Sequence, residues 1–219
     1  MNRRIAIILP FVLLTIANFS DASTPLGAKY KIISEKPNNK FRKDILEIML
    51  SKRIDKRTLR KIAITLREKR LQYDRLFIFY YIPGITVDVG AWAISHFTPD
   101  FGEDIKILGT TEKEDEALDK VTIKEGVIIG KWKDIRPMAE SVMIIFQKGG
   151  KLKLKTTFMD GSSMEQEIVE KRLYGKTRYD YAEYFHGEYF ILENNKNLGM
   201  YGPDGKFAEA KIIMPSSGK

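Results

Sequence analysis

Residues 76–82, with the sequence LFIFYYI, decide the fold of the first half of this 219-residue chain. The seven consecutive apolar or aromatic side chains predict a β-strand covered on both faces, because a strand with one face in water alternates between apolar and polar residues. Pro83 and Gly84 follow at once and are typical of a turn. The sequence therefore predicts a buried strand at the centre of a sheet.

One helix stands out among the elements around this strand. Apolar residues between Asp55 and Arg70 recur at helical spacing on one face, and Asp55 is a favourable N-cap. Strands are predicted at residues 29–34, 91–97 and 104–108. Residues 45–50 fit a helix or a strand by pattern, and we favour the strand. This order predicts an α+β domain over residues 23–110, with one amphipathic helix on a mostly antiparallel sheet.

The second half of the chain has a different pattern of apolar and polar residues. Thr111 and Glu114 form a capping box that predicts a short acidic helix, which we take as a linker over residues 111–122. After it, short alternating segments are separated by turn-forming residues, which predicts a small antiparallel β-barrel-like meander over residues 123–219. The predicted strands are 127–132, 141–146, 152–158, 166–170, 189–193, 198–201 and 207–213.

The N-terminus has the order of regions found in a secretory signal peptide. Arg3 and Arg4 precede an apolar run over residues 5–17, and small residues at Ser20 and Ala22 suit a signal peptidase. We predict a signal peptide over residues 1–22, with cleavage after Ala22 or, as an alternative, after Ala17. The protein is therefore expected to be exported to the periplasm or secreted, with no transmembrane segment after signal cleavage.

Charge and cysteine content restrict the partners. The chain has 37 Lys and Arg against 29 Asp and Glu, and its lack of cysteine excludes disulfides, thiolate metal sites and a cysteine nucleophile. The basic helix face could bind an anionic surface, including peripheral membrane contact, or could simply be solvated. Export argues against nucleic acid as a partner. The candidate residues for anionic-surface binding are Lys56, Arg57, Arg60 and Lys61.

Candidates for chemistry are few. His96 could act as a base, with Asp100 near it in sequence, or could be a structural residue. Ser95 cannot serve as its nucleophile partner, because neighbours on a strand point to opposite faces. No cofactor motif occurs, and two histidines without cysteine predict no metal site. The candidate ligand-binding residues are Trp92, His96, Trp132, Tyr184 and His186.

Two sets of motifs carry a resemblance. The first set is Pro83-Gly84, Gly90-Ala91-Trp92-Ala93, His96-Phe97-Thr98-Pro99 and Lys106-Ile107-Leu108-Gly109. It resembles a group of exported bacterial proteins with a PG…GAWA…HF.P…KILG signature and a β-rich second half, which implies export and no particular activity. Gly130-x-Trp132 is similar to the opening strand of lipocalin-like (calycin-like) barrels, where the Trp closes the barrel floor.

These observations lead to one favoured function and two alternatives. We expect an exported, non-enzymatic binding protein of the bacterial cell envelope that recognises a protein or an apolar or anionic ligand. The alternatives are an envelope hydrolase centred on His96 and an inhibitor or immunity-type protein.

Overall fold

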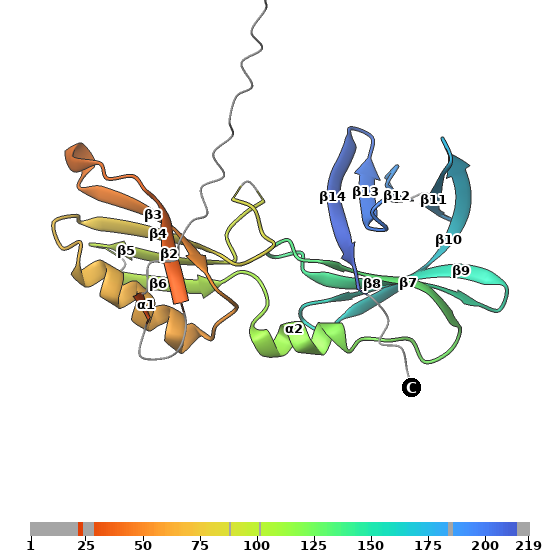
Figure 1. Cartoon of the computed structure of the whole chain (residues 1–219), viewed down its shortest axis with the longest axis horizontal. Helices are drawn as coiled ribbons and strands as arrows, with labels where there is room; N and C mark the ends of the chain where they lie inside the picture. Colours follow the sequence, from red (N-terminus) through yellow and green to blue (C-terminus); the bar gives the residue numbers. More distant parts are fainter. Residues whose placement is uncertain (1–21, 24–28, 88, 101, 184–185, 214–219) are drawn as a thin grey trace, which may run out of the picture.

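The structure, a computed structural model, describes residues 22–23, 29–87, 89–100, 102–183 and 186–213. The predicted signal peptide lies outside these residues except for Ala22. The chain forms a six-stranded sheet and an eight-stranded barrel that lie side by side (Figure 1).

The sheet is antiparallel except at one place. β3 and β4 are parallel, and α1 (Lys56–Glu68) connects them, because two adjacent parallel strands need a crossover. A short 3₁₀ helix, η1 (Asn39–Phe41), lies in the β2–β3 connection. In spatial order the strands are β1 (Ala22–Ser23), β2 (Lys29–Glu35), β3 (Lys43–Leu50), β4 (Arg75–Tyr81), β5 (Ala93–Thr98) and β6 (Gly102–Ile107).

Helix α1 forms as its sequence predicts. The side chain of Asp55 accepts a hydrogen bond of 2.7 Å from the amide of Thr58, which satisfies one of the free donors at the helix start. The buried side of the helix packs into the core of the sheet domain. This side consists of Thr58, Leu59, Ile62, Ala63 and Leu66.

Strand β4 lies at the centre of the sheet, as predicted, but the prediction that both of its faces are covered is wrong. Leu76 and Ile78 are buried in the same cluster as α1, whereas Phe77 and Phe79 on the other face are only half-buried. Both alternating sets of side chains are apolar, so the sequence does not distinguish the covered face from the open one.

The second half is a closed antiparallel barrel, which confirms the predicted fold class. Each strand pairs with the next, and β14 closes the barrel against β7 through the Ile212–Trp132 and Lys211–Lys133 pairs. The structure adds one strand that the sequence analysis does not predict, over residues 176–181. The strands are β7 (Val127–Asp134), β8 (Ser141–Lys148), β9 (Lys151–Phe158), β10 (Ser163–Leu173), β11 (Lys176–Tyr181), β12 (Tyr189–Leu192), β13 (Leu198–Gly202) and β14 (Gly205–Ile212).

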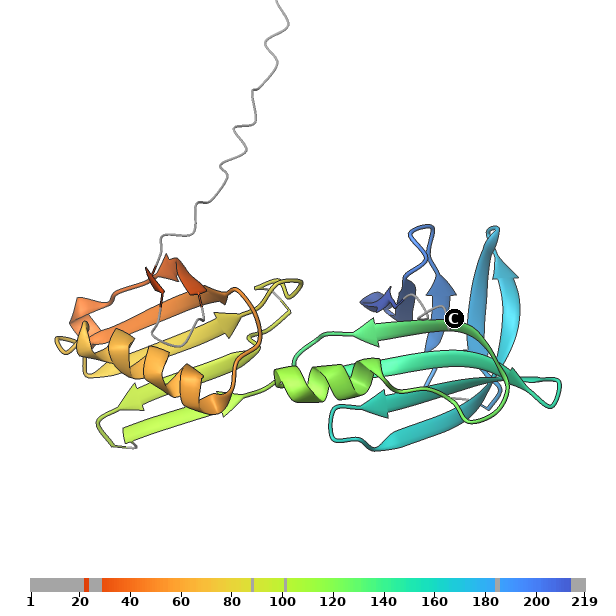
Figure 2. The same ribbon diagram turned by 60° about the horizontal axis from the view of Figure 1, so that its bottom comes forward.

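Helix α2 (Glu112–Asp119) joins the sheet to the barrel. The predicted capping box is present, with Thr111 and Glu114 each bonding the backbone of the other. Leu118 packs with Val142 and Ile144 on the outside of the barrel, so this linker is also a part of the barrel's packing. Figure 2 shows α2 lying against the barrel at the end nearest the sheet. Over the residues described, no helix is both long and apolar enough to cross a membrane.

Candidate functional site

The barrel has a cavity of about 370 Å³ at one end, which we call the mouth. It lies where β7, β9, β11 and β13 end, between the β7–β8 loop and the first residues of β12. The lining residues are Asp134, Arg136, Met138, Ala139, Ser141, Met143, Thr156, Phe158, Met164, Tyr181, Glu188, Tyr189, Phe190, Met200, Tyr201 and Phe207.

The mouth is mostly apolar and contains four of the eight methionines of the chain. Met143 and Met200 are buried at its base, whereas Met138 and Met164 are exposed at the rim. Unbranched thioether side chains adapt to the shape of a ligand, as on other surfaces that bind several partners. Burial also raises the pKa of Tyr181 to about 12, so this phenol stays uncharged well above neutral pH.

The charged groups of the mouth largely compensate one another. Arg136 donates from Nε and Nη2 to the carboxylate of Asp134, at 3.0 and 2.6 Å. Its guanidinium also lies 5.7 Å from the ring centre of Phe207, within the range of a cation–π contact. Glu188 is half-buried at the rim and adds a negative charge. The mouth therefore favours uncharged, apolar ligands over anions.

The loop between β7 and β8, residues 135–140, is part of both the mouth and the contact with the sheet domain. Arg136 and Met138 line the mouth, whereas Ile135 packs against the core of the sheet domain. The amide of Met138 donates to the carbonyl of Leu108, at 3.0 Å. Residue 140, at the end of the loop, is the centre of a buried ionic network.

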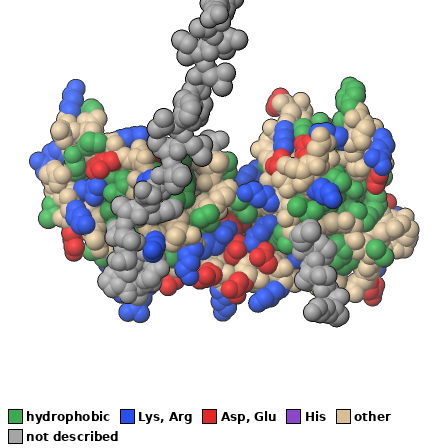
Figure 3. Space-filling view, in the orientation of Figure 1, with side chains coloured by type: hydrophobic (Ala, Val, Ile, Leu, Met, Phe, Trp, Pro, Cys, Tyr) green, Lys and Arg blue, Asp and Glu red, His purple; other side chains and the backbone are tan. Residues whose placement is uncertain are grey.

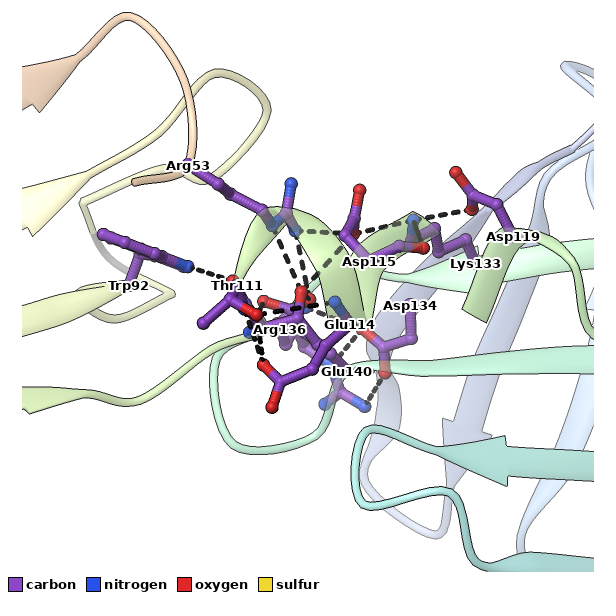
Figure 4. A network of polar contacts seen from close by, with 11 residues as sticks. Arg53, Trp92, Thr111, Glu114, Asp115, Asp119, Lys133, Asp134, Arg136 and Glu140 are labelled. Atoms are coloured by element: carbon purple, nitrogen blue, oxygen red, sulfur yellow. Dashed lines mark hydrogen bonds and ion pairs between the residues drawn. The ribbon is translucent and has the colours of Figure 1, made fainter. Parts of the chain in front are cut away.

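This network joins the two domains (Figure 4). The carboxylate of Glu140 has no exposed surface and accepts hydrogen bonds from the amide and hydroxyl of Thr110 and from Nη2 of Arg53, the last at 3.0 Å. Arg53 also pairs with Asp115 of α2 at 3.1 Å. The indole of Trp92 donates to the carbonyl of Thr110 at 2.8 Å. Side chains from the sheet domain, α2 and the barrel thus meet around one carboxylate.

His96 lies on the half-buried face of the sheet rather than in a cleft. Its ring packs edge-on against Phe77, with centroids 4.8 Å apart, and its buried Nε2 has no hydrogen-bond partner among the described atoms. Burial lowers the pKa of His96 below its ordinary value. Ser95 is buried on the opposite face, and Asp100 is exposed in the turn after β5. These residues do not assemble into a nucleophile and its base.

The other candidate ligand residues are dispersed. Trp92 is fully buried just before β5, and Trp132 lies in the barrel core. His186 is exposed in the β11–β12 loop, and Tyr184 lies outside the described residues. The structure does not bring these residues into one site. This loop does lead directly to mouth residues Glu188 and Tyr189.

The four candidate basic residues of α1 are exposed, as the outer face of an amphipathic helix requires: Lys56, Arg57, Arg60 and Lys61. Arg60 forms a two-pronged ion pair with Glu103 of β6, at 2.6 and 3.1 Å, so part of the positive charge is compensated within the protein. Lys56, Arg57 and Lys61 remain on the outer side of the helix. On the face shown in Figure 3, cationic and anionic side chains mix over α2 rather than forming a patch of one sign.

Neither a metal-binding cluster among the described residues nor a similar protein indicates a function for this chain. Within the described ranges, no group of three or more His, Cys, Asp or Glu residues could hold a metal ion. Comparison of the chain with protein-family models, with curated proteins and with solved structures found no match.

Proposed function

We propose that this chain is an exported binding protein of the bacterial cell envelope whose barrel mouth takes a small, uncharged, apolar molecule. The observation that carries the proposal is the cavity at the end of a closed barrel, lined by thioether and aromatic side chains and with its arginine compensated by Asp134. Its volume of about 370 Å³ suits a compact ligand, since small-molecule sites are typically concave, apolar and a few hundred Å³ in size.

The mouth offers a matched pair of substitutions. Met164 and Val169 lie on the same strand, β10, and are 38% and 39% exposed, so either position can accept a charge without burying it. Strand alternation places Met164 on the inner side, at the mouth, and Val169 on the outer side. Met164→Glu therefore puts a carboxylate beside the ligand, and Val169→Glu is the control.

The probe is N-phenyl-1-naphthylamine, an uncharged apolar fluorophore whose emission rises on leaving water. The wild-type protein should bind it saturably, and Val169→Glu should bind it equally well. Met164→Glu should weaken binding about tenfold, because an ion held next to an apolar ligand loses part of its hydration. Absence of saturable binding to the wild-type protein, or equal weakening by both substitutions, would contradict the proposal.

Support for export comes from the basic, apolar and small-residue regions of residues 1–22. Expression of the full chain in a bacterial host, followed by fractionation and intact-mass measurement, tests it. We expect a periplasmic or secreted product that begins at Ser23. A full-length product in the cytoplasm would refute export without affecting the binding proposal.

A further inference from the structure

We propose that the end of the barrel opposite the mouth is a second ligand site, which takes a small organic anion with an apolar ring. A cavity of about 510 Å³ lies there, where β7 and β11 begin and β10, β12 and β14 end. We call it the base site. Its lining residues are Ile129, Gly130, Trp132, Arg172, Gly175, Lys176, Thr177, Leu192, Glu193, Asn194, Lys196 and Ile212.

An apolar floor is built around Trp132. A Cβ on Gly130 would lie 2.1 Å from Cη2 of this indole, so only glycine lets the ring lie flat over its own strand. The indole Nε1 donates to the carbonyl of Lys196 at 2.8 Å, which fixes both the ring and the β12–β13 turn. Ile129 and Ile212 line the same cavity as Trp132 and are 48% and 37% exposed. Apolar surface of this kind is left for a ligand to cover.

The rim of the base site carries an excess of positive charge. The cationic lining residues are Arg172, Lys176 and Lys196, against Glu193 as the anionic one. Glu193 pairs with Lys176 at 2.6 Å and with Lys206 at 3.3 Å, and Lys206 also pairs with Glu209. These contacts lower the pKa of Glu193 to about 2, first through the hydrogen bond from Lys176. Arg172 reaches Glu170 only at 4.0 Å, and Lys196 makes no ion pair with a described residue.

The two ends of the barrel therefore differ in charge. At the mouth, Asp134 compensates Arg136 and Glu188 adds a negative charge. At the base site, Arg172 and Lys196 are left to receive an anion, for which guanidinium and ammonium groups are strong donors. A ligand with an apolar ring on Ile129 and Ile212, beside Trp132, and an anionic group at the rim satisfies both parts.

The test uses 8-anilinonaphthalene-1-sulfonate, which combines aromatic rings with one sulfonate. Titrations are made in the Met164→Glu background, where the added carboxylate at the mouth disfavours anion binding there. The two indole N–H signals in the NMR spectrum, from Trp92 and Trp132, report the location directly. We expect the Trp132 signal to shift during the titration and the Trp92 signal to stay in place.

A second test of the base site removes the two charges that are proposed to bind the anion. Arg172→Gln with Lys196→Gln should weaken probe binding about tenfold, because charge-assisted hydrogen bonds are stronger than neutral ones. Lys171→Gln is the control, since it removes a neighbouring charge that pairs with Asp180 on the outer face of β10 and β11. It should change affinity by less than about twofold, because Lys171 lies on the opposite face of β10 from Arg172 and does not line the base site. An unmoved Trp132 signal at saturation, or unchanged affinity in the double variant, would overturn the proposal, whatever happens at the mouth.

Discussion

Replacing Arg53 with Met is expected to destabilise the protein by about 3–5 kcal/mol, because removing one partner of a buried ion pair leaves an uncompensated charge. The charge left behind is that of Glu140, whose side chain has no exposed surface and keeps only the two donors of Thr110. A loss of this size is a large part of the roughly 5–15 kcal/mol that holds a typical protein folded. For a chain of this length it corresponds to a fall of about 6–20 °C in melting temperature.

The matched control is Arg42→Met. Arg42 pairs with Asp74 at 2.8 Å, but these side chains are 60% and 46% exposed. The same change of residue there should reduce stability by less than about 1 kcal/mol, since exposed ion pairs contribute little. The difference between the two variants therefore isolates burial.

A double-mutant cycle completes the test. Glu140→Gln should cost about 1–2 kcal/mol, because its amide oxygen can still accept from Thr110 and Arg53 keeps Asp115. The two substitutions together should cost less than their sum, with an interaction of about 2 kcal/mol. Urea unfolding followed by tryptophan fluorescence provides the energies. An interaction of zero, or a loss in Arg53→Met no larger than in Arg42→Met, would refute this reasoning.

Three further substitutions test single features. Glu193→Gln should remove about 2–3 kcal/mol of stability at neutral pH, because the folded pKa of Glu193, about 2, lies below the ordinary 4.5. This stabilisation is present above pH 4.5 and is lost as pH falls towards 2. Urea unfolding that shows the same pH dependence in the variant and the wild-type protein would contradict it. Gly130→Ala should cost about 1–3 kcal/mol by displacing the ring of Trp132. Gly202→Ala is the control and should be nearly neutral, because the nearest atom would be 3.8 Å from its new Cβ. Equal falls in melting temperature in the two variants would show that the close approach of residue 130 to Trp132 is unimportant. His96→Phe should preserve stability at pH 7 and abolish the loss of stability that the wild-type protein shows as pH falls below about 6.5, because burial lowers the histidine pKa and protonation then favours the unfolded chain. A loss above about 1 kcal/mol at pH 7 would point instead to a polar contact of His96.

Local sequence patterns predict most of the fold. Helix α1 with its Asp55 cap and the capping box at Thr111 depend on residues close together in the chain. Because such signals are local, they survive without knowledge of the tertiary structure. The same holds for the change from helical to alternating patterns after residue 123.

The missed strand shows where local patterns mislead. In β11, Thr177, Tyr179 and Tyr181 point inward, while Arg178 and Asp180 pair on the outside. This alternation is present in the sequence, but the dense tyrosines of residues 179–189 fit a lid packed on the barrel core or a recognition surface in a loop, and neither interpretation predicts a strand. An inward Tyr with its hydroxyl near the barrel end is compatible with both interpretations until the neighbouring strands are known.

The candidate site could not be assembled from the sequence. Met143, Met164 and Met200 come from three strands, and Arg53 and Glu140 are 87 positions apart. No spacing rule connects such residues, since closure of the barrel and docking of the sheet bring them together. The gathering of four of the eight methionines around one cavity is visible only in the structure.

The β7–β8 loop also bears on how such a chain can evolve. Residues 135–140 supply a wall of the mouth, an apolar contact with the sheet core and the carboxylate that Arg53 compensates. A recombination that joined this barrel to a different N-terminal domain would leave Glu140 without its cation and Ile135 without its core. The barrel is therefore not a freely exchangeable module, and Arg53 and Glu140 should be inherited, or lost, together.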